Sequence, residues 1–181
     1  MSRQQSPRKS RRTGQKLAIR RATPRDLDTL VHQRRAMWED MGVKDQSALD
    51  RADRAYEKWM QKRLRDRTLL GWIVEGKGGV VAGGGCLWMQ PIQPRPGYTR
   101  GIQPYLLSMY TEPGFRGKGV ASLIVEEAAN WTRKRGYPSL RLHASGMGRG
   151  LYRKLGFQRA WEMKLEFDRQ YPRRRARTRS H

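Results

Sequence analysis

The sequence predicts an α/β fold in which a mixed central sheet carries helices on both faces. An apolar run at residues 105–110 enters a turn with glycines, and a helical pattern leaves that turn. Two amphipathic helical patterns come before this unit, and two alternating, strand-like segments follow it. Strands and helices mixed in this way favour a sheet covered by helices.

The N-terminal third is predicted to be a short strand, residues 17–21, followed by two helices. Thr23, Pro24 and Asp26 have the residue types of an N-cap, a first helical position and a capping-box acid. That helix ends at Gly42, and the second covers about residues 47–65. The expected buried stripes are Leu27, Leu30, Val31, Met37, Trp38 and Met41 in the first helix, and Leu49, Ala52, Tyr56, Trp59 and Met60 in the second.

The middle of the chain predicts a hairpin and a long loop. Segments 72–75 and 80–82 flank a glycine-rich turn at 76–79, which is a hairpin signal. The glycine run 83–85 lies inside the second hairpin strand and indicates a bulge or the close approach of another backbone. Residues 90–104 contain four prolines and are predicted to be an irregular loop before the central strand.

The C-terminal third is predicted to be helix, strand, short helix and strand. From Val120 to Trp131 apolar residues recur with helical spacing. Residues 139–143 alternate as a strand does, and residues 161–167 do so again. No internal repeat or linker interrupts this pattern, so one domain is expected over residues 17–168.

The turn before the long C-terminal helix has the properties of a phosphate-binding turn. The first backbone amides of a helix have no intrahelical acceptor, and the helix dipole adds partial positive charge there. Gly117 and Gly119 would let an anion approach these amides, and Arg116 and Lys118 add full charges.

Two better-known phosphate loops do not fit this turn. A P-loop requires lysine and then serine or threonine after its second glycine, but Val120 and Ala121 follow Gly119. A dinucleotide fingerprint requires glycine or alanine where Ser122 stands. It also requires an acid about 20 residues later, where residues 135–139 offer none.

Two short motifs resemble signatures of the GCN5-related N-acetyltransferases. Residues 116–121 read RGKGVA and resemble that family's arginine/glutamine-x-x-glycine-x-glycine/alanine turn. Residues 150–157 read GLYRKLGF and are similar to the signature on its last helix. The resemblance covers roughly residues 17–167, although its specific motifs lie only within residues 109–157. It implies a sheet of about six to seven strands and an N-acetyltransferase that uses acetyl-coenzyme A and no metal.

The resemblance also implies roles for individual residues. The family's turn holds the coenzyme pyrophosphate, and the end of its central strand contacts the pantetheine arm and polarises the thioester carbonyl. Ser145 stands where many members have an asparagine that bonds the pantetheine. The implied coenzyme-binding set is Met109, Tyr110, Thr111, Arg116, Gly117, Lys118, Gly119, Val120, Ala121 and Ser145. Tyr152 has the position of the usual general acid, since a phenol can protonate a departing thiolate.

No motif fixes the general base that would take a proton from the amine. His143 follows a predicted strand, and Glu112 lies beside the phosphate turn. Gln103 or Tyr105 could instead hold a water. All of these candidates stay open.

The single cysteine and the absence of long apolar runs set the expected environment. Cys86 has no partner for an internal disulfide and lies in an apolar run, which predicts a buried structural thiol and favours a cytoplasmic setting. No stretch approaches the length of a membrane span, and the N-terminus is too polar for a signal peptide.

The formal net charge of +23 is concentrated at the two ends of the chain. Residues 1–16 and 169–181 each contain six Lys or Arg and no acid, which leaves +11 for residues 17–168. These two basic tails lack an apolar pattern and are predicted to be disordered. They are expected either to be solvated extensions or to contact nucleic acid non-specifically through its phosphates.

Two classes of function therefore remain at this stage. One is an acetyl-coenzyme A-dependent N-acetyltransferase that transfers acetyl directly to a primary amine of a small molecule or peptide. The other is a catalytically weak binding module that docks on nucleic acid through the basic tails. The acceptor is expected to be set by the first two helices and the 90–104 loop. The sequence leaves open whether the protein is a homodimer.

Overall fold

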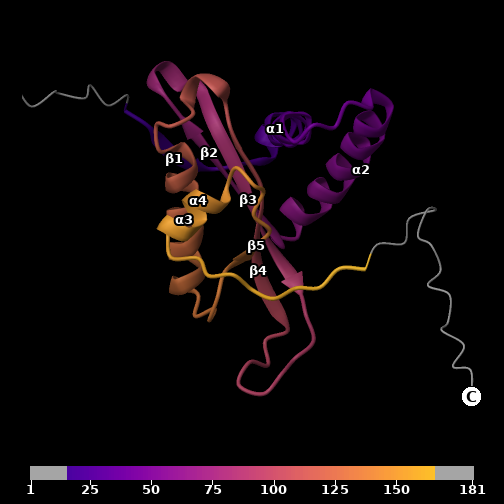
Figure 1. The fold of residues 1–181 in the computed structure, drawn as a ribbon, viewed down its shortest axis with the longest axis vertical. Coiled ribbons are helices and arrows are strands. Elements are labelled where there is room, and N and C mark those ends of the chain that lie inside the picture. The colour runs from indigo at the N-terminus through magenta and orange to yellow at the C-terminus, as the bar shows by residue number, and fades with distance from the viewer. Residues whose placement is uncertain (1–15, 166–181) are drawn as a thin grey trace, which may run out of the picture.

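A computed structural model describes residues 16–165 of the chain (Figure 1). In this part of the chain five strands form one sheet in the order β1-β2-β3-β4-β5. They are β1 (Ala18–Arg21), β2 (Leu69–Glu75), β3 (Val81–Pro91), β4 (Ile102–Thr111) and β5 (Arg141–Leu142). The first four are antiparallel and β5 is parallel to β4, so the sheet is mixed, as predicted.

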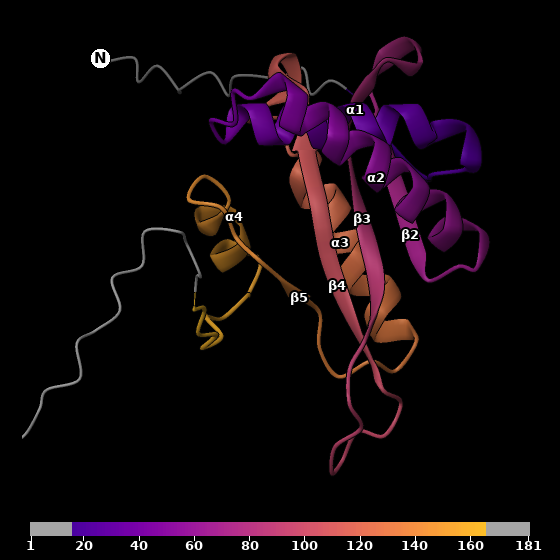
Figure 2. The same ribbon diagram turned by 90° about the vertical axis from the view of Figure 1, so that its right-hand side faces the viewer.

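Helices cover both faces of the sheet, which confirms the predicted fold class. One face carries α1 (Leu27–Asp40) and α2 (Gln46–Arg65). The other carries α3 (Val120–Lys134), which connects β4 to β5, and the short α4 (Arg149–Lys154) (Figures 1 and 2). The two faces have separate cores, one around Trp72 and Ile124 on the α3 side and one around Met60 and Leu69 on the α1/α2 side.

The entry into α1 follows the predicted capping pattern, through a 3₁₀ turn at Pro24–Asp26. The Asp26 carboxylate accepts hydrogen bonds from the Thr23 amide at 2.7 Å and the Thr23 hydroxyl at 2.9 Å. It also accepts two from the Arg20 guanidinium, at 2.8 and 2.9 Å, which ties β1 to the helix start. These charge-assisted bonds lower the pKa of Asp26 from 3.8 to about 2.

The predicted glycine run lies where the strand backbones approach most closely. A Cβ at Gly83 would lie 2.5 Å from the Tyr110 carbonyl oxygen, and one at Gly85 would collide with the Met109 sulfur. Opposite this run β4 carries a bulge, because two residues, Ser108 and Met109, span the distance that Gly85 covers on β3. The close approach expected from these glycines is therefore confirmed.

Three predicted elements are shorter or absent. The sheet has five strands within residues 16–165 instead of six to seven, and residues 161–165 form no strand. The predicted strand at 139–143 pairs only at Arg141–Leu142, because the chain then turns away from β4. The predicted 90–104 loop is shorter, since β3 and β4 extend into it and leave residues 92–101 between them.

Parts of several predictions lie outside the described residues. The two basic tails lie outside the described residues, apart from Lys16. The last two residues of the predicted 161–167 strand also lie outside them. None of the helices within residues 16–165 is long and apolar enough to cross a membrane.

Candidate active site

Strands β4 and β5 separate beyond a short paired segment, and a cavity lies at that point. Parallel pairing of β4 and β5 is limited to Tyr105 with Arg141 and Leu106 with Leu142. Beyond these pairs, residues 143–145 diverge from β4. The cavity beside them has a volume of about 1030 Å³ and is lined by all four α-helices and by β3 and β4.

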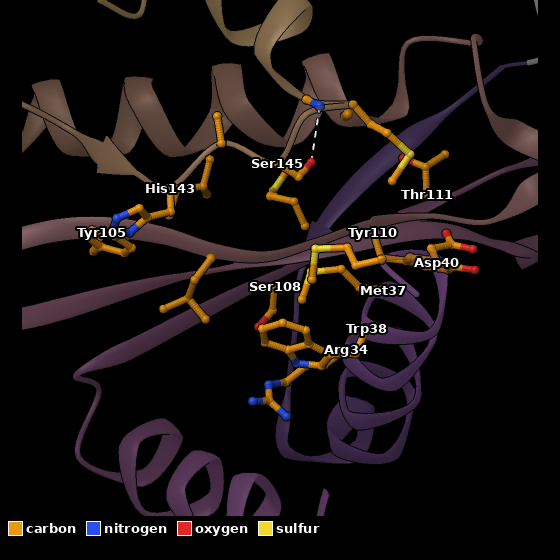
Figure 3. Close-up of a pocket in the computed structure, with 18 of the residues that line it drawn as sticks. Arg34, Met37, Trp38, Asp40, Tyr105, Ser108, Tyr110, Thr111, His143 and Ser145 are labelled. Atoms are coloured by element: carbon orange, nitrogen blue, oxygen red, sulfur yellow. Dashed lines mark hydrogen bonds between the residues drawn. The ribbon is translucent and has the colours of Figure 1, made fainter. Parts of the chain in front are cut away.

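Most of the residues singled out from the sequence meet in this cavity. Its lining includes seven of the residues expected to bind the coenzyme or act as the acid: Met109, Tyr110, Thr111, Arg116, Ala121, Ser145 and Tyr152. Gly117, Lys118 and Gly119 lie next to it in the turn before α3, whereas the Val120 side chain is 1% exposed and belongs to the core. Figure 3 shows Tyr105 and His143 together at one end of the cavity and Asp40 with Thr111 toward the other.

The turn before α3 has the backbone expected of an anion site. Gly117 and Gly119 adopt φ of +73° and +89°, a conformation that side chains with a Cβ rarely take. A Cβ at either position would meet no heavy atom within 4 Å, so the space beside the turn is open. The first bond of the helix runs from the Leu123 amide to the Gly119 carbonyl at 3.1 Å, so the amides of residues 120–122 precede the helical ladder.

Arg116 connects this turn to the other face of the sheet. Its Nη2 atom forms an ion pair with Asp40 Oδ2 at 2.5 Å, and its Nε donates to the Thr111 carbonyl at 3.2 Å. Asp40 is the last residue of α1, so the ion pair joins the predicted phosphate turn to the helix that covers the opposite face.

The β4 bulge brings backbone groups to the cavity wall. Ser108 has φ of +52°, which is uncommon for a residue other than glycine and marks the position of the extra residue. A bulge leaves part of the strand backbone outside the ladder. Ser108 and Met109 both line the cavity, so this irregular part of the β4 backbone lies at the cavity wall.

Tyr152 and Ser145 approach the cavity from the α4 side. Tyr152 is half-buried and packs edge-on against Phe157, and burial raises the pKa of its phenol above the ordinary value of 10.0. It is therefore a neutral acid at pH 7. Ser145 accepts hydrogen bonds from the amides of Gly148 and Arg149 through its carbonyl oxygen, so it also caps the turn that leads into α4.

Of the four candidates for a general base, Tyr105 and His143 line the cavity. The Tyr105 hydroxyl is hydrogen-bonded to His143 Nδ1, and His143 Nε2 lies 3.0 Å from Glu162 Oε2. Leu106 packs in the α3-side core and Leu107 packs against the α1/α2-side core, so the alternation of β4 directs Tyr105 toward the α1/α2 side, where its hydroxyl meets His143. The side chains of Tyr105, His143 and Glu162 therefore form a chain of polar groups that runs from the α1/α2 side of the cavity to the surface.

The other two candidates have structural contacts instead. Gln103 is 4% exposed, and its amide donates to the Ser139 carbonyl at 3.1 Å. Glu112 accepts a hydrogen bond from Gln33 at 3.4 Å and does not line the cavity. Both therefore connect elements of the fold.

Cys86 is completely buried, as predicted, and burial raises the pKa of its thiol to about 12. Such a thiol is not a nucleophile at neutral pH. Within residues 16–165 there is no group of three or more His, Cys, Asp or Glu side chains that could hold a metal ion.

Comparison with known proteins identifies the family. The family model described as "Acetyltransferase (GNAT) family" matches residues 30–157, which is more than half of the chain. The chain belongs to the GNAT family. The matched region begins in α1 and ends just after α4, so it contains the turn, the cavity and Tyr152.

Solved structures of other GNAT proteins share the fold. A GCN5-related N-acetyltransferase from Ralstonia eutropha is 27% identical with a TM-score of 0.76, and the alignment covers 84% of this chain and 99% of that one. A predicted acetyltransferase with acetyl-CoA from Clostridium acetobutylicum is also 27% identical, with a TM-score of 0.75 and coverage of 84% and 96%. An uncharacterized N-acetyltransferase of Methanocaldococcus jannaschii is 27% identical over 108 residues, which span 58% of this chain and 45% of that relative.

The first two helices were expected to set the acceptor, but the residues on the α1/α2 side of this GNAT cavity were not individually predicted to be in the site. Met37, Trp38, Ala52, Tyr56 and Trp59 were expected to form buried stripes, and all of them line the cavity. Helical spacing shows that residues share a face, but it does not show whether that face covers a core or a cavity. Lining residues that were not singled out from the sequence for this site include Arg34, Asp40, Trp88 and Ser108.

Proposed function

We propose that this protein is an N-acetyltransferase that transfers acetyl from acetyl-coenzyme A to a primary amine in a ternary complex. The observation that carries the proposal is one cavity that joins the glycine turn, the β4 bulge and Tyr152. The GNAT membership of the chain and the acetyl-CoA in the Clostridium acetobutylicum structure support it.

The coenzyme would be held by backbone and side-chain donors that fit its charge. The amides of residues 120–122 and the Arg116 guanidinium would bind the pyrophosphate, and Gly117 and Gly119 leave the space for it. Residues 109–111 would contact the pantetheine arm along the separated edge of β4, with Ser145 on the opposite wall. When bound, acetyl-coenzyme A supplies the acetyl thioester.

The proton transfers would be divided between the two sides of the cavity. On the α1/α2 side, the Tyr105 hydroxyl would accept a proton from the amine while it passes its own proton to His143. Glu162 would stabilise the resulting imidazolium. On the α4 side, Tyr152 would give its proton to the departing thiolate. A backbone N–H of the bulge would stabilise the negative charge that develops on the carbonyl oxygen.

Two measurements on the full chain test this proposal. Calorimetric titration with coenzyme A should give saturable binding to one site. Release of free thiol from acetyl-coenzyme A, followed with a broad amine panel, should depend on both the protein and the amine. Binding without any amine-dependent release would favour the alternative of an inactive binding module, and absence of binding would contradict both the site and the activity.

A further inference from the structure

The α1/α2 side of the cavity carries one positive charge that no partner in the described chain neutralises. This charge belongs to Arg34, whose Cζ lies 4.2 Å from the ring centroid of Tyr56 and 5.7 Å from that of Trp38. The Nη1 atom of Arg34 is buried and has no hydrogen-bond partner within residues 16–165. Figure 3 shows Arg34 and Trp38 reaching from α1 on the side of β4 opposite Ser145.

A buried guanidinium nitrogen without a partner is costly, and Arg34 lines the cavity with no ion pair among the described residues, so an anionic group in the cavity is the partner that suits this guanidinium best. An unmade hydrogen bond at a charged group costs more than the bond contributes when it is made. Guanidinium binds carboxylate and phosphate through paired, charge-assisted hydrogen bonds. The rings of Tyr56 and Trp38 hold the group in place and limit its access to water.

Carboxylates near this side of the cavity are already paired with other arginines. Among the described residues, Asp40 is the only acid that lines the cavity, and it pairs with Arg116. Three further acids of α1 and α2, Glu39, Asp50 and Asp53, pair with Arg35, and none of them lines the cavity. A polycationic acceptor, such as a polyamine or an aminoglycoside, would therefore meet an unbalanced positive charge and no unpaired carboxylate in the described cavity lining.

The surrounding rings add a flat apolar surface. Trp59 stacks on Tyr56 at 5.6 Å between ring centroids and meets Trp88 edge-on at 5.5 Å, and all three rings line the cavity. Arg63 stacks on Trp59 with its Cζ 4.3 Å from the ring centroid, which adds a second positive charge beside this surface. Such a wall suits a ring or an apolar chain on the acceptor.

We propose that the acceptor is an amine that also carries an anionic group, either a carboxylate or a phosphate, and that Arg34 binds this group. This inference rests on the proposed function. The body of the acceptor packs on the aromatic wall, and its amine reaches the Tyr105 and His143 pair. Arg34 thereby selects amino acids or amino sugar phosphates over amines of the same shape that lack the anion.

The test compares acceptors that differ only in the anionic group. Each of a set of apolar and aromatic α-amino acids is paired with its decarboxylated amine, and glucosamine 6-phosphate is paired with glucosamine. Spermidine represents the polycations. Binding to the coenzyme A-saturated protein is measured by calorimetry, and turnover is measured by thiol release. The amino-acid pairs and the sugar pair distinguish a carboxylate from a phosphate.

Three variants separate the charge from its geometry. Arg34→Gln removes the charge, and Arg34→Lys keeps it without the planar fork. Arg51→Gln is the control, because Arg51 is an exposed arginine on α2 whose one hydrogen bond within the described residues goes to Ser47. In the wild type the anionic member of at least one pair should be favoured by about 10- to 100-fold in kcat/KM, the usual range for a charged hydrogen bond. Arg34→Gln should abolish this preference, Arg34→Lys should retain part of it, and Arg51→Gln should leave it unchanged.

Several results would contradict the role of Arg34 while leaving the proposed acetyltransferase function intact. They are equal use of both members of every pair, a preference for spermidine, and an anion preference that persists in Arg34→Gln. If no anionic acceptor binds or reacts while carboxylate-free amines are acetylated, the transferase stands and this inference fails. If coenzyme A does not bind at all, the proposed function fails, and an anion preference in calorimetry of the wild-type protein without coenzyme would still support the role of Arg34.

Discussion

Arg116 and Asp40 form an ion pair that joins the glycine turn to the last residue of α1. Both side chains line the cavity, and they are 47% and 36% exposed. A carboxylate and a pyrophosphate are alternative partners for the same guanidinium. In the proposed function, coenzyme binding must therefore compete with this ion pair for Arg116.

We predict that Asp40→Asn tightens coenzyme A binding. Removing the carboxylate leaves Arg116 free of its competing partner, and a half-exposed pair of this kind contributes about 0.2–1 kcal/mol, which corresponds to an increase of up to about fivefold in affinity. Calorimetry measures the change. Glu39→Gln, one residue earlier and paired with Arg35, is the control and should bind as the wild type does. Weaker binding in Asp40→Asn would mean that Asp40 positions Arg116 for the coenzyme.

We predict that Gly119→Glu abolishes coenzyme A binding. The substitution places a negative side chain in the open space where the pyrophosphate would lie. Because φ is +89° at this residue, any side chain also introduces strain, so Gly119→Ala is the matched control. Gly119→Ala should bind coenzyme A measurably, and circular dichroism should show both variants folded. Equal affinities of the two variants for coenzyme A would show that the turn is not part of the coenzyme site.

The local chemistry of the sequence predicted the glycine turn, α3 and the start of α1 well. The glycines of the turn, the α3 pattern from Val120 and the start of α1 at Thr23 depend on nearest neighbours in the chain, and the structure has them as predicted. The close approach at Gly83 and Gly85 could also be predicted, because a run of glycines inside a strand leaves room for another backbone.

The individual residues on the α1/α2 side of the cavity could not be predicted, because they meet only through tertiary structure. Arg34 stands in an amphipathic helix where an arginine is ordinary, and only the packing of α1 on α2 places it against Tyr56. The strand at 139–143 was predicted too long because alternation of side chains does not show where a neighbouring strand diverges. Only Arg141 and Leu142 have a partner on β4.

We predict that Asp26→Asn destabilises the fold in a pH-dependent way. The pKa of Asp26 falls from 3.8 to about 2 on folding, so its contribution is fully present above pH 4 and is lost as the pH falls toward 2. At pH 7 the variant should lose about 1–2 kcal/mol of unfolding free energy, allowing for the partial exposure of Arg20. Urea unfolding at several pH values measures it, with the exposed Asp28→Asn as control. A difference that stays constant from pH 7 to pH 2.5 would contradict this account of Asp26.

We predict that His143→Gln slows turnover most at neutral pH. Without His143, Tyr105 has no acceptor for its proton, and kcat/KM should fall by about 10²-fold or more at pH 7. The loss should shrink toward pH 9–10, since the free amine then loses its proton to solvent (primary amine pKa about 10). His32→Gln, an exposed histidine on α1, is the control. A loss that is the same at every pH would assign His143 a structural role.

The most direct test of the account is the turnover of Tyr152→Phe at saturating acetyl-coenzyme A and acceptor, measured together with its affinity for coenzyme A. The substitution keeps the ring that packs on Phe157 and removes only the acidic proton. The account predicts unchanged coenzyme affinity and a fall in kcat of about 10²- to 10⁴-fold, with Tyr137→Phe, whose ring stacks on Trp131 and does not line the cavity, as the control. Wild-type kcat in Tyr152→Phe would contradict it, because the proton for the departing thiolate would then come from another group.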